Sequence, residues 1–329
     1  MTSFIELASA NLLSPMVLFF VLGVVAALLR SSLSVPEAVA KALSIYLIMA
    51  IGLKGGHEVA LAGISASLVY ALLAGVILSF LLPLLAYGAL RATTKLPAVD
   101  RASIAAHYGS ISIVTFLAAV EVIRGLGYGA EGYMVAVAAV MEVPAILSGL
   151  WLAARTSGHS DATAGAVGVD RTLLREVMLN GSIVLLVGAF LIGAVIGDKG
   201  MSAVAPLIVD PFKGVLCIFL LDMGLVAGRG LRDGWRKITP AVLLFGLYMP
   251  LLGAGAGWLS GFALGLQTGG VALLMVLCAS ASYIAVPAAM RLALPDANPS
   301  ISLTLALGLT FPFNLTIGIP IYIAAASLI

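Results

Sequence analysis

Long apolar runs, separated by short polar or glycine- and proline-rich breaks, follow one another along the whole chain. A helix needs about 20 apolar residues to cross the hydrocarbon core of a bilayer. We therefore predict an all-α membrane protein with ten spans. Their expected bounds are about 12–30, 36–55, 63–91, 99–124, 130–155, 174–196, 203–228, 237–261, 268–294 and 299–328.

The composition supports a membrane protein and excludes several other classes. Hydrophobic residues make up 62% of the 329 residues, and charged residues only 10%, against roughly 25% in a soluble domain. The net charge of +2 gives no indication of a nucleic-acid partner. The chain carries neither a phosphate-binding loop nor the ligand spacing of a zinc site. We expect a transporter and not an enzyme.

The two halves of the chain resemble each other at an offset of about 170 residues. Lys41 matches Lys213, Gly52 matches Gly224, and Pro144 matches Pro312 in the same order. We divide the chain into a first repeat, 1–155, a polar linker, 156–172, and a second repeat, 173–329. Five spans per repeat is an odd number, so the second repeat enters the membrane from the opposite side. Inverted repeats of this kind are typical of secondary transporters.

The positive charges favour one orientation in the membrane. Lys and Arg concentrate on cytoplasmic loops. With both termini outside, 13 of the 17 Lys and Arg residues lie on the inner side, together with the linker 156–172. The outer side keeps Lys54, Arg124, Lys199 and Lys213. We predict a multi-pass protein of the cell's inner (plasma) membrane.

The centres of the fourth and ninth spans are the least regular. Glycine, clustered serines and a following proline weaken a helix, so we predict that both spans are broken near the bilayer midplane. The N–H groups at such a break need a partner and suit a small anion. The predicted anion site comprises Gly109, Ser110, Ile111, Ser112, Ser280, Ala281, Ser282 and Tyr283. Serines also serve helix packing, and we interpret His107 as a core hydrogen-bonding residue.

Oxygen-bearing side chains near the matched prolines provide a candidate sodium site. Glu142 precedes Pro144, and Thr310 and Asn314 flank Pro312. A charge inside the membrane is expensive and usually functional. We predict Na⁺ binding by Ser112, Glu142, Thr310 and Asn314. The alternative is a polar cluster that only bridges helices.

Four sequence runs resemble the sodium-dependent bicarbonate transporters first known from cyanobacteria: AIGLKGG at 50–56, LPAVDRASIAAHYGS at 96–110, AAHYGSISIVTF at 105–116 and VPAAMRLALPDANPS at 286–300. The resemblance covers nearly the whole chain. It implies a five-plus-five inverted fold with a gate part and a mobile core part. It also implies Na⁺-coupled symport of bicarbonate into the cell by an elevator-like motion, with Na⁺ as the co-transported ion and no organic cofactor.

The same resemblance implies a homotrimer and a PII-like regulatory partner on the cytoplasmic face. The linker 156–172 is shorter than in the cyanobacterial members, and this difference argues against regulation by a PII-like partner. Two other functions stay open from the sequence. One is sodium-coupled transport of another small anion such as an organic carboxylate, and the other is an anion channel or sensor.

Overall fold

The computed structural model describes residues 9–63, 65–156, 179, 181–234, 238–283, 286–287, 290, 294 and 296–328. Within these residues every regular element is a helix, which confirms the all-α prediction. Most of the linker 156–172 lies outside the described residues. In the part of the chain that the structure describes, six helices are long and apolar enough to cross a membrane: Glu37–Leu61, Ala66–Thr93, Val184–Ile208, Phe212–Arg232, Pro240–Ala263 and Pro299–Ala326.

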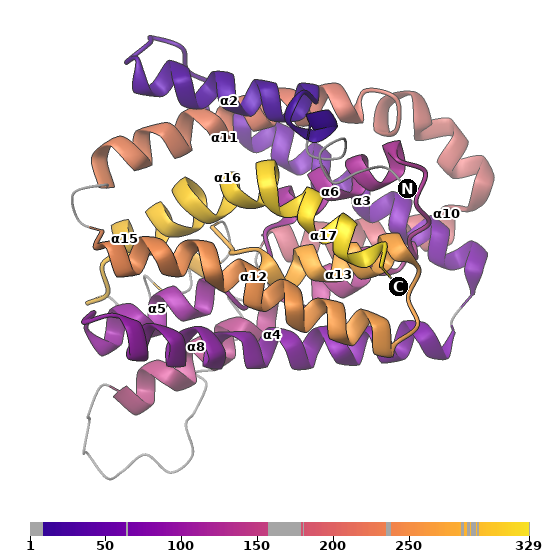
Figure 1. The fold of residues 1–329 in the computed structure, drawn as a ribbon. Helices are drawn as coiled ribbons and strands as arrows, with labels where there is room; N and C mark the ends of the chain where they lie inside the picture. Colours follow the sequence, from indigo (N-terminus) through magenta and orange to yellow (C-terminus); the bar gives the residue numbers. More distant parts are fainter. Residues whose placement is uncertain are drawn as a thin grey trace.

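The helices of the first half follow the predicted apolar runs closely (Figure 1). They are α2 (Pro15–Leu28), α3 (Glu37–Ala62), α4 (Ala66–Thr93), α5 (Ala98–His107), α6 (Ile113–Gly125), α7 (Met134–Val140) and α8 (Glu142–Thr156). The second half contains α10 (Gly181–Ile208), α11 (Phe212–Gly234), α12 (Pro240–Ala263), α13 (Thr268–Ala279), α15 (Pro299–Leu303), η2 (Thr304–Thr310), α16 (Phe311–Phe313), η3 (Asn314–Gly318) and α17 (Ile319–Ala326).

The run predicted as one helix over 130–155 divides into α7 and α8. In a continuous helix the Met141 carbonyl would accept a hydrogen bond from the Ala145 N–H. Instead, the Ser79 hydroxyl of α4 donates to the Met141 carbonyl, and the Ala145 N–H donates to Ser79 Oγ over 3.1 Å. A side chain that inserts in this way kinks a helix, and the sequence of the run itself does not reveal it.

The last span keeps its predicted length but contains two π-helical segments, η2 and η3. Pro312 lies between them in α16. Proline cannot donate the main-chain hydrogen bond of an α-helix, and π-turns are a common accommodation, frequently at functional sites. The wider turns of η2 and η3 carry Thr310 and Asn314, two of the predicted sodium ligands.

Two pairs of helices pack with their backbones in contact, α2 with α11 and α3 with α10. A Cβ built on Gly23 would lie 2.2 Å from the Leu221 carbonyl oxygen. In the other pair, a Cβ on Gly193 would lie 2.1 Å from the Leu53 carbonyl oxygen. Close approach through small residues is typical of helices packed in membranes. In Figure 1 α2 runs alongside α11 at the edge of the molecule.

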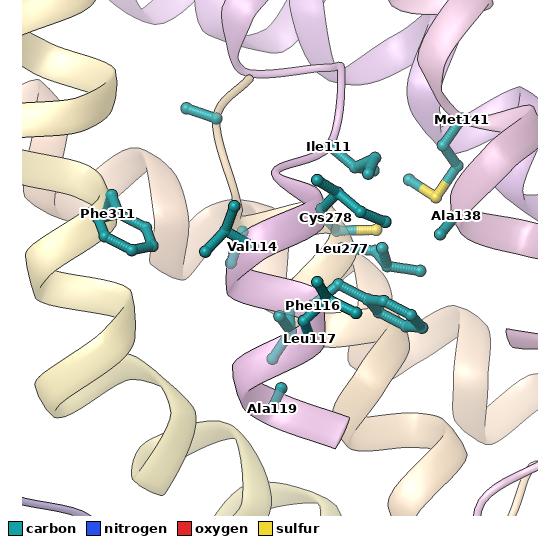
Figure 2. Packing of buried hydrophobic residues seen from close by; sticks show 14 of the residues in the cluster. Ile111, Val114, Phe116, Leu117, Ala119, Ala138, Met141, Leu277, Cys278 and Phe311 are labelled. Carbon is teal, nitrogen blue, oxygen red and sulfur yellow. The ribbon is translucent and has the colours of Figure 1, made fainter. Parts of the chain in front are cut away.

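The interior of the molecule is formed by α5, α6 and α13, which are buried along most of their length. Figure 2 shows apolar side chains packed around the first turns of α6, with Phe311 on one side and Met141 on the other. Both Ile111 and Cys278 belong to this buried cluster. The two predicted anion-binding segments, 109–112 and 280–283, therefore lie in or next to this buried cluster.

Candidate functional site

The chain is not helical over 108–112, between α5 and α6, and over 280–283, directly after α13. These two segments contact each other. The Ser282 N–H donates to the His107 carbonyl oxygen over 2.8 Å, and the Ser112 N–H donates to Ser280 Oγ over 2.9 Å. The fold thus brings together residues about 170 positions apart in the sequence.

His107 is fully buried and fastens the two segments together. Its Nδ1 lies 2.6 Å from the Ser282 carbonyl oxygen. A carbonyl oxygen only accepts hydrogen bonds, so this geometry places the imidazole proton on Nδ1. The interpretation of His107 as a core hydrogen-bonding residue is confirmed.

Gly109 allows the first segment to lie directly on α4. A Cβ built at this position would lie 2.2 Å from Pro83 Cγ and 2.8 Å from the Ser79 carbonyl oxygen. Both atoms belong to a buried stretch of helix with little freedom to move. Only glycine fits here without displacing the residues that follow, including Ser110 and Ser112.

Several hydrogen-bond donors at the start of α6 lack an acceptor. Ser112 caps this helix, because its Oγ accepts from the Thr115 N–H over 3.3 Å and from Thr115 Oγ1 over 2.9 Å. No hydrogen bond joins the N–H groups of Ile113 and Val114 to another described residue. The N-terminus of a helix carries a partial positive charge and favours anions.

Tyr283 adds a donor of its own beside this helix start. Its hydroxyl is buried and makes no hydrogen bond to a described residue. Its ring packs edge-on against Phe311, with centroids 5.5 Å apart. Figure 2 places the Val114 side chain on the Phe311 side of α6. A buried hydroxyl without a partner is unusual in a folded protein and points to a ligand.

Ser110 faces a different neighbour from Ser112. Its hydroxyl donates to Glu142 Oε2 over 3.0 Å. Glu142 is buried, and within the described residues no cation forms an ion pair with it. A buried carboxylate without a counter-charge is strongly unfavourable. This corner of the site can therefore accommodate a cation.

Thr310 and Asn314 have structural hydrogen bonds. Thr310 Oγ1 donates to the Gly246 carbonyl oxygen over 2.8 Å and lies 2.6 Å from the Tyr108 hydroxyl. The Asn314 amide donates to the Ala279 carbonyl oxygen, the last of α13, over 2.9 Å. Within the described residues, neither side chain forms a hydrogen bond with Glu142. Within the described residues, the predicted sodium ligands therefore do not form a single group of contacting side chains.

Two carboxylates that the sequence patterns did not indicate accept main-chain hydrogen bonds and so hold the segments of the site together. Asp100 in the first turn of α5 accepts from the Asn298 N–H over 2.7 Å. Glu131 accepts from the Gln267 N–H at the start of α13, also over 2.7 Å. The only available signal was that Asp100 and Asn298 both lie in the runs that carry the family resemblance.

A family model for the Na⁺-dependent bicarbonate transporter superfamily matches residues 15–327. The chain belongs to this superfamily. No curated protein matches the chain. The match confirms the resemblance over both halves of the chain. Together with the six long apolar helices, it identifies a multi-pass membrane protein of a transporter superfamily whose activity depends on Na⁺ and whose substrate is bicarbonate.

Proposed function

We propose that this member of the superfamily carries bicarbonate and Na⁺ together into the cell, and that bicarbonate binds between the start of α6 and residues 280–283. The observation that carries the site is the buried Tyr283 hydroxyl, which makes no hydrogen bond to a described residue and belongs to the segment that contacts the start of α6. Bicarbonate offers three acceptor oxygens and one negative charge. Backbone and hydroxyl donors bind such an anion and still release it, whereas a bidentate arginine would hold it more strongly.

Sodium supplies the positive charge that this site otherwise lacks. We place it near Glu142, a buried carboxylate with no counter-charge among the described residues, and Ser112 would reach it from the neighbouring segment. The hydrogen bonds to Gly246 and Ala279 use the Thr310 hydroxyl proton and the Asn314 amide protons, so lone pairs of Thr310 Oγ1 and Asn314 Oδ1 stay available for the same ion. Carrying one anion inward against a negative-inside potential costs about 2.3 kcal/mol per 100 mV, and one co-transported Na⁺ cancels that cost.

The ten spans would form two inverted repeats, 1–155 and 173–329, with the fourth and ninth spans broken at the midplane. The glycine contacts support this architecture. Gly23 and Gly193 are repeat mates, as are Gly52 and Gly224. Gly23 packs against Gly224 in the α2–α11 pair, and Gly193 packs against the turn of α3 that contains Gly52. Equivalent residues thus make equivalent contacts in the two pairs.

We propose that transport uses an elevator motion between two parts of the molecule. The pairs α2–α11 and α3–α10 would form the gate part, and the site with α4, α12 and the last span would move as the core part. The homotrimer, the PII-like partner and the outward position of both termini stay predictions from the sequence.

Uptake of labelled bicarbonate into proteoliposomes tests the proposal. We expect uptake with an inward Na⁺ gradient, and none when K⁺ replaces Na⁺. The Tyr283→Phe variant should raise the KM for bicarbonate about tenfold, the loss of one hydrogen bond to a charged group. Tyr70→Phe is the matched control, because Tyr70 is exposed on α4. A folded protein without Na⁺-dependent uptake would refute symport, and a Tyr283→Phe variant with the KM of Tyr70→Phe would refute the site.

A further inference from the structure

A cavity of about 150 Å³ is lined by the second half of α5 and by the start of the last span. Its described lining has three polar side chains, Ser103, His107 and Ser302, and no charged one. A space of this volume holds an ion together with several water molecules. The predicted orientation places the start of the last span on the cytoplasmic side, so we call this space the inner cavity.

His107 contributes an unused hydrogen-bond acceptor to the inner cavity. Its Nδ1 carries the proton that is donated to the Ser282 carbonyl oxygen. A buried imidazole that forms no ion pair with a described residue is neutral, and the Nε2 of this tautomer can only accept. The two ring nitrogens point away from each other, so Nε2 faces away from Ser282. No hydrogen bond joins Nε2 to a described residue.

Two serines add hydroxyl oxygens to the same cavity. Ser103 lies one turn before His107 on the same face of α5, and its side chain is only 3% exposed. Its hydroxyl forms no hydrogen bond with a described residue, which is unusual for a buried polar group. Ser302 donates its proton to the Pro299 carbonyl oxygen over 3.2 Å, so its oxygen offers lone pairs only. A ligand in the inner cavity therefore meets mainly lone pairs from the described side chains.

The charges nearest to the inner cavity on α5 favour a cation. The last turn of α5 carries the partial negative charge of a helix C-terminus, and the C-terminal ends of half-helices coordinate Na⁺ in membrane transporters. Asp100 lies one turn before Ser103 on the same face of α5. It is 8% exposed and forms no ion pair with a described residue. The neighbouring Arg101 lies instead over the Tyr87 ring of α4, 5.5 Å from its centroid.

The start of the last span contributes the positive end of a helix, but this end already has acceptors. Asn298 Oδ1 accepts from the Ser300 N–H over 3.1 Å, and Asp100 accepts from the Asn298 N–H over 2.7 Å. A helix end carries about half an elementary charge, whereas the Asp100 carboxylate carries a full one. The helix end therefore does not convert the inner cavity into an anion site.

We propose that the inner cavity is a second binding site for a small monovalent cation, Na⁺. The ligands are lone pairs of Ser103 Oγ, His107 Nε2 and Ser302 Oγ, and water molecules complete the coordination. Glu142 does not line the inner cavity, so this position is distinct from the one proposed near that carboxylate. Na⁺ that leaves the central site for the cytoplasm would stop here. This place on the release path rests on the proposed function, whereas the binding of Na⁺ does not.

Equilibrium binding of radioactive Na⁺ to the purified protein, in choline buffer without bicarbonate, tests the site independently of transport. Glu142→Gln removes the charge at the other cation position, and we expect this variant still to bind Na⁺. Adding Ser103→Ala should raise the Kd about tenfold, because a contact to a charged ligand is lost. Adding Ser148→Ala is the control, since buried Ser148 of α8 donates to the Ala145 carbonyl oxygen and does not line the inner cavity. A Glu142→Gln protein that binds no Na⁺, or equal Kd values for the two double variants, would overturn the proposal.

Two substitutions of His107 separate the cation ligand from the structural hydrogen bond. In His107→Asn the amide N–H takes the place of Nδ1 and still donates to the Ser282 carbonyl oxygen, but no atom replaces Nε2. In His107→Gln the amide oxygen takes the place of Nε2, but the donor to Ser282 is lost. In the Glu142→Gln background, we expect His107→Asn to raise the Kd for Na⁺ about tenfold with little change in Tm. His107→Gln should lower the Tm and keep the Kd. The opposite pattern, or an unchanged Kd in both variants, would exclude Nε2 as a ligand and refute the site.

Discussion

The contact between Gly109 and α4 makes a quantitative prediction for the smallest possible substitution. In Gly109→Ala the new methyl group would lie 2.2 Å and 2.3 Å from Pro83 Cγ and Cδ and 2.8 Å from the Ser79 carbonyl oxygen. The proline ring is rigid, and Ser79 and Pro83 are both buried, so the segment 108–112 must move instead. Overpacking of this kind typically costs 1–3 kcal/mol. A shift of a few tenths of an ångström would also misalign Ser112, whose N–H meets Ser280 Oγ at 2.9 Å.

The assay compares Gly109→Ala with Gly88→Ala. Gly88 lies in α4, the helix that Gly109 contacts, but a Cβ there meets nothing within 4 Å. We expect Gly109→Ala to lower the apparent Tm by several degrees and to reduce Na⁺-driven bicarbonate uptake at least tenfold, while Gly88→Ala keeps the wild-type values. A Gly109→Ala protein with the Tm and uptake of Gly88→Ala would show that the segment is not held as described.

Two further substitutions separate sodium binding from structural hydrogen bonding. Glu142→Gln keeps a partner for Ser110 but removes the negative charge, so the half-saturating Na⁺ concentration should rise at least tenfold with little change in Tm. An unchanged sodium dependence would remove Glu142 from the cation site. Thr310→Val should lower the apparent Tm, because the loss of one partner leaves the Tyr108 hydroxyl unsatisfied at a cost of about 1–3 kcal/mol. Tyr108→Phe is its control, and a sodium dependence altered in Thr310→Val alone would make Thr310 a ligand after all.

The amino-acid sequence was sufficient to predict the class of the protein and the positions of two non-helical segments. Apolar runs of membrane-spanning length predict helices because every backbone polar group in lipid must be paired within its own segment. The helices α4 and α12 accordingly match the predicted runs to within a few residues. Glycine and clustered serines identified 108–112 and 280–283 because their effect on a helix is local. The runs around His107 and Asn298 were sufficient for the family resemblance.

Tertiary structure decided which of these residues face one another. Ser110 and Ser112 are two positions apart, yet one meets Glu142 and the other meets Ser280. The division between α7 and α8 depends on Ser79, which is about 60 residues away in the sequence. The lack of a hydrogen-bond partner for the Tyr283 hydroxyl also became visible only in three dimensions. Sequence patterns report the propensity of each segment, whereas hydrogen-bond partners depend on the distances between segments, which only the packed fold sets.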